Sequence, residues 1–217
     1  MNAALVPVKR LAAGKSRLAG ALDRDTLEAL MRCMLEDVVA ALRRVPSVDA
    51  IFVVTPDADV AEAARRAGAQ PMLRDDPGLN PALEAASAEL AARGADTLLI
   101  VLGDVVGIRP EEVAELYAAL ARQGDRGVVL APARDGGTGA LLRAPAAVIA
   151  CHFGPESARR HREAARTEGV PCCELALPSL ALDLDRPEDL EALEASPAAD
   201  APRTRALIAR LREARRA

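Results

Sequence analysis

Short apolar runs alternate along the chain with longer segments in which apolar residues recur every three or four positions. The segment Thr26–Arg44 is typical of the second kind and predicts an amphipathic helix. The segment Thr97–Leu102 is apolar almost throughout, as expected for a parallel strand that is covered on both faces. The predicted strands are Ala3–Val8, Ile51–Thr55, Gln70–Leu73, Thr97–Leu102, Gly127–Ala131, Ala140–Arg143, Cys172–Leu175 and Leu180–Leu184. The predicted helices are Thr26–Arg44, Asp57–Ala67, Pro81–Arg93, Pro110–Gln123, Pro155–Glu168, Pro187–Glu194 and Pro202–Arg215.

This alternation of strands and helices predicts a three-layer α/β domain with a mostly parallel sheet. At 217 residues the chain is long enough to bury a substantial core, and we expect a single domain over residues 1–217. Gly68 and Gly94 follow predicted helices and are expected to end them. Asp25, with Glu28 three residues later, resembles a capping box at the start of a helix.

The composition is that of a globular protein, with 51% hydrophobic and 28% charged residues. One Tyr, two Phe, no Trp and a net charge of −4 disfavour a nucleic-acid partner, because such binding relies on aromatic stacking and a broad basic surface. No apolar stretch approaches the ~20 residues of a membrane span. Lys9 and Arg10 interrupt the first apolar run, so we expect a cytoplasmic protein with no signal peptide and no membrane partner. The four cysteines form no C-x-x-C pair and are expected to be reduced structural thiols.

A basic loop follows the first predicted strand. Its Gly14-Lys15-Ser16 tripeptide looks like the end of a P-loop, but a Walker A motif requires Gly where this chain has Lys9. We therefore expect a phosphate grip made by the side chains of Lys9, Lys15 and Arg17. In an open α/β sheet, ligands bind beyond the carboxyl ends of the strands, where this loop is expected to lie. The alternative is a solvated basic loop.

Three carboxylates lie at or near the ends of predicted strands. Asp104 follows Thr97–Leu102, and Gly103 before it permits close approach to the backbone. Asp183 and Asp185 are two positions apart and are expected to project to the same side, with their Cα atoms roughly 6.5–7 Å apart. Two such carboxylates repel each other unless a cation lies between them, so the set predicts a Mg²⁺ site for transfer of a phosphorylated group. The alternatives are a turn or cap at Asp104, and a cap made by Asp185 for the helix that begins at Pro187.

Two small-residue loops predict a second anion site. They span residues 135–139 and 152–157, and the second leads into a helix whose N-terminus attracts anions. This pattern favours a phosphorylated acceptor, although a hairpin turn and a helix cap made by Ser157 would explain the same residues. Asn80 precedes another predicted helix and could cap it or read a base edge.

Taken in order, these segments resemble the 2-phospholactate guanylyltransferases of coenzyme F-420 biosynthesis, a family that includes members acting on phosphoenolpyruvate or 3-phosphoglycerate. The resemblance implies the Rossmann-like nucleotidyltransferase fold shared with molybdenum-cofactor guanylyltransferases, together with GTP, Mg²⁺ and a homodimer. It runs over nearly the whole chain, through Val6–Lys9, Lys15–Leu18, Gly78–Asn80, Gly103-Asp104, Asp135–Thr138, Phe153–Ser157, His161, Leu182–Asp185 and Pro187–Leu190.

The same resemblance implies roles for individual residues. It implies that Asp104, Asp183 and Asp185 are metal ligands, and that Thr138, Gly154 and Ser157 contact the acceptor's phosphate and carboxylate. Its nucleotide contacts are Lys9 and Lys15, to which we add Arg17, Asn80 and Gly103 as candidates. We expect Lys15 and Asp104 to be the residues most directly involved in catalysis.

Two positions depart from the family pattern. Val105-Val106 stands where the family usually has Leu-Pro, and Gly139 stands where it usually has Asn or Thr. The second change is expected to remove a polar side chain beside the acceptor and so to alter which phospho-acid is accepted.

The expected reaction is transfer of GMP from GTP to a small phosphorylated carboxylic acid, with release of pyrophosphate. A phosphate oxygen of the acceptor is already nucleophilic, so positioning and charge neutralisation are expected to supply the catalysis. The alternatives are a molybdopterin guanylyltransferase, which usually has a Gly-rich N-terminal loop, a cytidylyl- or uridylyltransferase, and a catalytically inactive nucleotide-binding protein.

Overall fold

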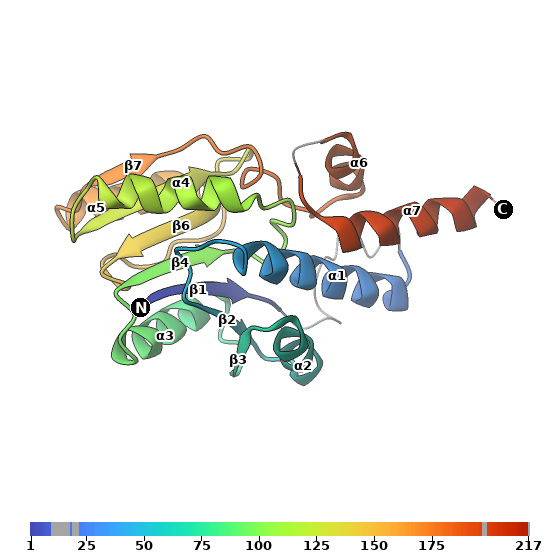
Figure 1. The fold of residues 1–217 in the computed structure, drawn as a ribbon, viewed down its shortest axis with the longest axis horizontal. Helices are drawn as coiled ribbons and strands as arrows, with labels where there is room; N and C mark the ends of the chain where they lie inside the picture. The colour runs from blue at the N-terminus through green and yellow to red at the C-terminus, as the bar shows by residue number, and fades with distance from the viewer. Residues whose placement is uncertain (10–17, 19–21, 197–198, 217) are drawn as a thin grey trace.

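The computed structural model describes residues 1–9, 18, 22–196 and 199–216 of the chain. Its strands are β1 (Asn2–Pro7), β2 (Ala50–Thr55), β3 (Gln70–Leu73), β4 (Thr97–Val101), β5 (Gly127–Pro132), β6 (Thr138–Ala144) and β7 (Cys172–Glu174). Its helices are α1 (Arg24–Leu42), α2 (Ala58–Ala67), α3 (Leu79–Ala92), α4 (Pro110–Ala121), α5 (Ser157–Thr167), α6 (Pro187–Ala195) and α7 (Pro202–Arg216). The strands form one seven-stranded sheet in the order β3-β2-β1-β4-β6-β5-β7 (Figure 1).

Most strand pairs in this sheet are parallel. β1 pairs in parallel with β2 and β4, β2 with β3, and β5 with β7. β6 runs antiparallel to β4 and β5, since a short turn joins it to β5. The predicted mostly parallel sheet is therefore confirmed. The carboxyl ends of β1, β2 and β4 lie side by side at one edge.

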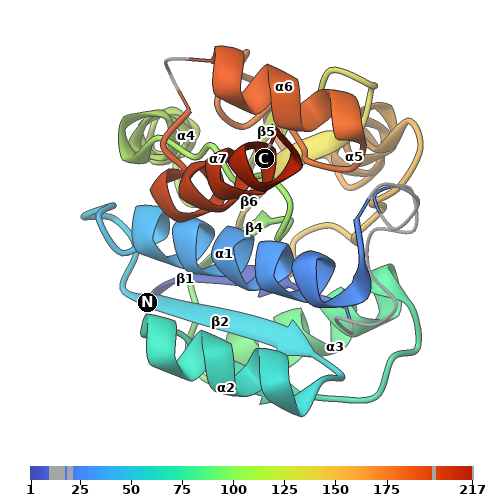
Figure 2. The ribbon, with the colours of Figure 1, turned by 90° about the vertical axis from the view of Figure 1, so that its right-hand side faces the viewer.

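The sheet separates two apolar cores, because successive side chains of a strand point to opposite faces. In β1, Ala4 and Val6 pack in the core that α1, α2 and α4 cover, whereas Ala3 and Leu5 pack in the core under α3 and α5. Figure 2 shows α1 on the near side of the sheet and α3 on the far side, behind β2. The predicted three-layer arrangement is thus confirmed. Within the described ranges, no helix is both long and apolar enough to cross a membrane.

All predicted elements except one have boundaries within two residues of those observed. Helix α2 ends at Gly68 as expected, with the glycine in the left-handed region at φ 94°. The cap of α1 differs from the prediction: Asp23, and not Asp25, accepts a hydrogen bond from the Thr26 backbone N–H at 2.8 Å. The reason is that α1 begins earlier than its apolar pattern indicates.

The predicted strand Leu180–Leu184 is wrong. Its backbone groups bond to loops and not to a neighbouring strand. The Ala181 carbonyl accepts from the Arg134 N–H at 3.3 Å, and the Leu184 N–H donates to the Asp104 carbonyl at 3.0 Å. Residues 178–186, called the strap below, therefore lie against the loops that follow β4 and β5.

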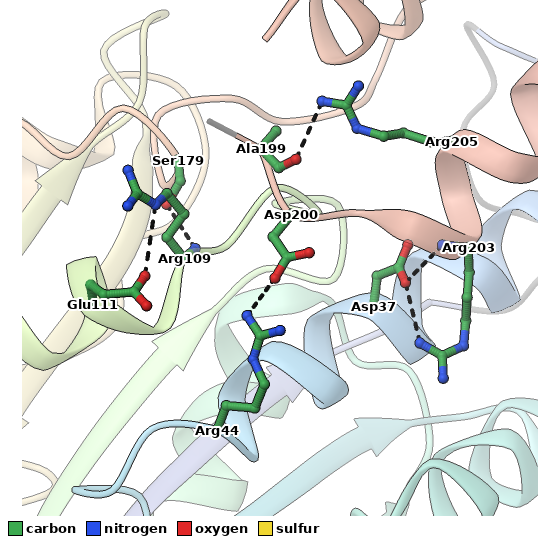
Figure 3. A network of polar contacts seen from close by, with 9 residues as sticks. All are labelled: Asp37, Arg44, Arg109, Glu111, Ser179, Ala199, Asp200, Arg203 and Arg205. Atoms are coloured by element: carbon green, nitrogen blue, oxygen red, sulfur yellow. Dashed lines mark hydrogen bonds and ion pairs between the residues drawn. The ribbon is translucent and has the colours of Figure 1, made fainter. Parts of the chain in front are cut away.

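The C-terminal helix α7 is held against α1 by Asp37. This side chain is buried, and its two oxygens accept from the backbone N–H groups of Arg203 at 3.2 Å and Thr204 at 2.8 Å. The first N–H groups of a helix have no partner within the helix, so Asp37 satisfies them from α1. Figure 3 shows Asp37 facing Arg203, with an ion pair between Arg44 and Asp200 nearby.

Candidate active site

A cavity of about 260 Å³ opens at the carboxyl ends of β1, β2 and β4. Its wall begins where each strand ends, with Val8 after β1, Pro56 after β2 and Gly103 after β4. This is the place where ligands bind in open α/β sheets. The complete lining is Pro7, Val8, Lys9, Met31, Met34, Val54, Thr55, Pro56, Asp75, Asp76, Gly78, Leu79, Ala82, Leu102, Gly103, Asp104 and Asp185.

The lining combines an apolar surface with charged groups. Met31 and Met34 of α1 supply apolar surface, which suits the face of a base, while Lys9, Asp104 and Asp185 supply charge of both signs. Such a cavity can hold a nucleotide whose phosphates lie beside the charged groups. Of the predicted basic grip, Lys9 lines the cavity and is exposed. Lys15 and Arg17 lie outside the described residues.

Gly103 packs against the end of β1. A side chain here would place its first carbon 3.0 Å from Val8 Cγ2 and 3.2 Å from the Pro7 carbonyl oxygen. The sequence predicted that another group approaches the backbone closely at Gly103. Within the described residues, that group is the end of β1. This close approach brings the ends of β1 and β4, and so Lys9 and Asp104, to the same cavity.

The strap brings the predicted carboxylates toward one another. The bond from Leu184 N–H to the Asp104 carbonyl joins the strap to the loop after β4. Burial raises the pKa of the Asp183 carboxyl, and the negative charges of Asp104, Asp185 and Asp135 raise it further. Asp183 is therefore close enough to these carboxylates for their charges to repel its own. Asp135 is a fourth acidic neighbour that the sequence did not single out as a candidate ligand.

The described carboxylates do not by themselves form a complete metal-binding site. Within the described residues, no group of three or more His, Cys, Asp or Glu side chains is arranged to hold a metal ion. The donor set still suits Mg²⁺, which prefers hard oxygen ligands and usually takes only one or two carboxylates together with phosphate oxygens and water. The raised pKa of Asp183 is the electrostatic sign of a site that a cation would stabilise.

Asp185 does not cap the helix that follows it, so that alternative is wrong. The N-cap of α6 is Arg186, and the carboxylate of Asp189 accepts from the backbone N–H groups of Asp185 at 2.9 Å and Arg186 at 2.6 Å. The Asp185 side chain instead lines the cavity.

A buried carboxylate of α4 anchors the start of the strap. Glu112 is 7% exposed, and its Oε2 accepts from Ser179 twice, from the N–H at 2.9 Å and from the hydroxyl at 2.7 Å. The Ser179 hydroxyl oxygen in turn accepts from the Arg109 N–H at 3.0 Å, which Figure 3 shows. Sequence analysis missed this contact, because an acidic residue in the first turn of a helix is normally a surface residue.

Gly139 has a different role from the predicted one. A side chain there would place its first carbon well inside van der Waals contact of the Leu180 carbonyl oxygen. The space that Asn or Thr would need is occupied by the backbone of the strap, so Gly139 is a packing position beneath the strap. At the other departure from the family pattern, Val105 and Val106 are buried in the core.

The two predicted acceptor loops meet at a pair of buried hydroxyls. Thr138 begins β6 and Ser157 begins α5, and the Ser157 hydroxyl lies 3.0 Å from Thr138 Oγ1. Ser157 is not the helix cap; that position is taken by Glu156, at φ 55°. Gly154 is in the same loop at φ 118°, and its carbonyl accepts from the Ser157 N–H at 3.2 Å. The structure thus brings together the three residues assigned to the acceptor.

Asn80 lies inside the first turn of α3, whose N-cap is Gly78, so its predicted capping role is wrong. Its amide oxygen accepts from the Phe153 N–H at 2.8 Å and its amide nitrogen donates to the Phe153 carbonyl at 3.0 Å. This pairing uses the amide edge that would read a base. Asn80 therefore fixes the loop that carries Gly154, and the structure does not support the base-reading role.

The comparison with protein families agrees with this site. Residues 2–196 match the family model described as "Guanylyl transferase CofC like". The chain belongs to this family of guanylyl transferases. Within it, a phosphoenolpyruvate guanylyltransferase of Sphaerobacter thermophilus is 44% identical over 191 residues, which cover 88% of this chain and 91% of the relative. A phosphoenolpyruvate guanylyltransferase of Rubrobacter xylanophilus is 40% identical over 193 residues, covering 89% and 93%.

Solved structures share the fold of this family member at low sequence identity. A putative nucleotide-diphospho-sugar transferase from Desulfovibrio desulfuricans superposes with a TM-score of 0.70 at 19% identity, covering 89% of this chain and 87% of the other. A nucleotidyl transferase from Methanothermobacter gives a TM-score of 0.64 at 18% identity, covering 90% and 96%. These likenesses confirm the predicted Rossmann-like nucleotidyltransferase fold.

Proposed function

We propose that this protein transfers GMP from GTP to a small phosphorylated carboxylic acid and releases pyrophosphate. The observation that carries the proposal is the cavity at the carboxyl edge of the sheet, where apolar surface from α1 lies beside Lys9, Asp104 and Asp185. Phosphoenolpyruvate is the first candidate acceptor, because the relatives at 40–44% identity are named for it. 2-Phospholactate and 3-phosphoglycerate are the other candidates, and coenzyme F-420 biosynthesis is the proposed setting.

In the proposed reaction, a phosphate oxygen of the acceptor attacks the α-phosphorus of GTP, and pyrophosphate leaves on the opposite side. Lys9 holds the triphosphate by charge, together with Lys15 and Arg17 of the basic loop. Thr138, Gly154 and Ser157 bind the acceptor and orient its phosphate toward the nucleotide. No side chain has to remove a proton, because the attacking phosphate oxygen is anionic. The chain contributes orientation and fixed charge, which can lower a barrier by several kcal/mol.

Asp104, Asp183 and Asp185 are the residues that would hold Mg²⁺. When bound, the ion supplies charge neutralisation for the triphosphate and the departing pyrophosphate. Asp104 and Asp185 line the nucleotide cavity, and Asp183 lies among the same carboxylates. One or two of them therefore suffice, with phosphate oxygens completing the coordination.

A panel of four NTPs against the three candidate acceptors tests the proposal. Pyrophosphate release is measured in the presence of Mg²⁺, and we expect turnover with GTP and at least one phospho-acid. Asp104→Asn is expected to lower the rate at least about a hundredfold. Asp125→Asn, at an exposed position in the turn between α4 and β5, is the matched control and should retain the full rate.

Three outcomes would contradict the proposal. Preference for CTP or UTP would indicate another nucleotidyl transfer. If a molybdopterin acceptor is added to the panel, turnover of that acceptor alone would indicate a molybdopterin guanylyltransferase. GTP binding without pyrophosphate release under any condition of the panel would assign an inactive nucleotide-binding protein.

A further inference from the structure

A buried imidazole is hydrogen-bonded to the Thr138–Ser157 hydroxyl pair of the acceptor loops. His161 of α5 is 0% exposed, and its Nδ1 lies 3.0 Å from Thr138 Oγ1. Its other ring nitrogen, Nε2, accepts from the His152 backbone N–H at 2.8 Å. Thr138 and Ser157 are themselves 3% and 1% exposed. His161 belongs to the sequence pattern shared with the family, and the proposed reaction gives it no role.

The contacts of His161 fix its protonation. A backbone N–H can only donate, so Nε2 must accept and carries no proton. Burial is the main cause that lowers the pKa of His161 to about 3, and electrostatic interactions with His152, Arg143 and Arg160 contribute to the same shift. The ring is therefore neutral at physiological pH with its single proton on Nδ1. It follows that Nδ1 donates to Thr138 Oγ1.

Counting protons then leaves one donor over. Thr138 and Ser157 have two hydroxyl protons between them, and their mutual contact at 3.0 Å uses one. Neither hydroxyl can donate to His161, because Nδ1 already carries a proton. In the described part of the chain, no second acceptor is recorded for either hydroxyl. A buried donor without an acceptor is unfavourable, so the remaining O–H is available to a ligand.

The surroundings show what kind of ligand this donor would meet. Thr138 lies between Asp135, whose charge reaches Asp183, and Gly139, on which the strap packs. The donor is thus close to the proposed metal carboxylates. Ser157 is the first residue of the 11-residue helix α5, where the helix dipole favours negative charge. A fixed O–H donor at this place suits an oxyanion.

We propose that His161 is a positioning residue, which fixes the Thr138–Ser157 hydroxyl pair so that its remaining O–H donates to an oxyanion of the phosphorylated acceptor. This inference rests on the proposed function and adds to it the residue that orients the acceptor contact. His161 itself does not touch the substrate. Because its Nδ1 carries a proton, His161 donates to Thr138 Oγ1 and cannot accept the hydroxyl proton of Thr138 or Ser157. One hydroxyl proton therefore remains for the ligand.

Two substitutions separate the two hydrogen bonds of the imidazole. In His161→Asn, the amide nitrogen lies near the position of Nδ1 and can still donate to Thr138, while the acceptor for the His152 N–H is lost. In His161→Gln, the longer amide reaches the position of Nε2 and can accept from His152, while the donor to Thr138 is lost. Thermal unfolding of both variants confirms that they are folded before their kinetics are compared.

The expected result is a difference confined to the acceptor. With phosphoenolpyruvate, His161→Gln should raise the acceptor KM about tenfold or more, which is the effect of one hydrogen bond to a charged group, and leave the GTP KM unchanged. His161→Asn should stay within about threefold of the wild type. Equal losses in both variants, or a matching rise in the GTP KM, would show a purely structural role and overturn the proposal.

Direct binding separates this inference from the proposed function. If calorimetry shows that the wild type binds phosphoenolpyruvate but GMP is not transferred, the proposed function fails, and the affinities of the two variants still decide the role of His161. If the wild type binds no phospho-acid, the role of His161 is overturned. Competition with lactate, which has only a carboxylate, and with glycerol phosphate, which has only a phosphate, identifies the oxyanion. His161→Gln should bind one of these two competitors more weakly than the wild type does. If it binds both as tightly as the wild type, the proposal is contradicted.

Discussion

The contact between Glu112 and Ser179 should determine where the strap lies, and Ser179→Ala tests this. The substitution removes the hydroxyl that donates to Glu112 Oε2 at 2.7 Å and accepts from the Arg109 N–H at 3.0 Å. It keeps the backbone bond from the Ser179 N–H to Glu112 at 2.9 Å. The start of the strap therefore keeps its backbone bond to Glu112 but loses the side-chain bonds that fix its orientation.

The size of the effect follows from these contacts. A hydrogen bond to a charged group contributes about 1.5–3 kcal/mol, and the neighbouring Arg109 N–H adds a smaller loss because it is only partly buried. We expect a loss of about 2–3 kcal/mol, which for a chain of this size lowers the melting temperature by roughly 5–10 °C. GMP transfer should fall at least about tenfold at temperatures where the variant is folded, because the strap carries Asp183 and Asp185.

Differential scanning calorimetry and the pyrophosphate assay measure the two effects. Ser47→Ala is the matched control, because no hydrogen bond of the Ser47 hydroxyl is recorded within the described residues. A double-mutant cycle with Glu112→Gln should show a coupling of about 1 kcal/mol or more. Additive effects, or a Ser179→Ala variant that melts and turns over like the wild type, would refute the reasoning.

Three further predictions concern the strap and the acceptor loops. Gly139→Ala should lower the melting temperature and GMP transfer more than Gly124→Ala, which meets open space and loses only about 1 kcal/mol of backbone preference; equal losses would contradict the packing role. Asp183→Asn should raise the melting temperature of metal-free protein at neutral pH while abolishing transfer, because a carboxyl with a raised pKa destabilises the fold as pH rises through that value; a lower melting temperature would count against it. Because the pKa of His161 falls from 6.5 to about 3 on folding, the unfolded state binds the extra proton, and between these values the wild type should lose up to about 1.4 kcal/mol of stability per pH unit as pH falls. Urea titrations at several pH values should show that His161→Gln lacks this part of the loss in unfolding free energy. An identical pH dependence in the variant and the wild type would disprove the prediction.

The strap shows why part of the candidate site could not be predicted. Leu180, Leu182 and Leu184 are all buried, so the alternation that predicted a strand is real. Alternation reports only which side chains are buried, and it cannot say whether a strand edge is available for pairing. Here the neighbouring backbone groups belong to the loops after β4 and β5, and the segment bonds to those loops. The assignment of the three carboxylates to a metal stays a prediction, but the strand that was expected to carry Asp183 and Asp185 is not formed.

The sequence by itself determined the features that depend on neighbours along the chain. Apart from the wrong strand Leu180–Leu184, apolar periodicity defined the strands and helices to within two residues, and the order of motifs indicated the family that the comparison then showed. It also placed Asp104 directly after a buried strand, which is enough to put it at the carboxyl edge of a parallel sheet. These conclusions need only local spacing, because burial and chain direction are encoded residue by residue.

Only the tertiary structure decided the contacts between residues far apart in the chain. It paired Glu112 with Ser179, Asn80 with Phe153, and Thr138 with both Ser157 and His161, across separations of 19 to 73 residues. No spacing rule predicts such pairs, because a buried polar group takes whichever partner the packing of sheet and helices brings within about 3 Å. The same packing explains Gly139, whose missing side chain makes room for a backbone 41 residues further along.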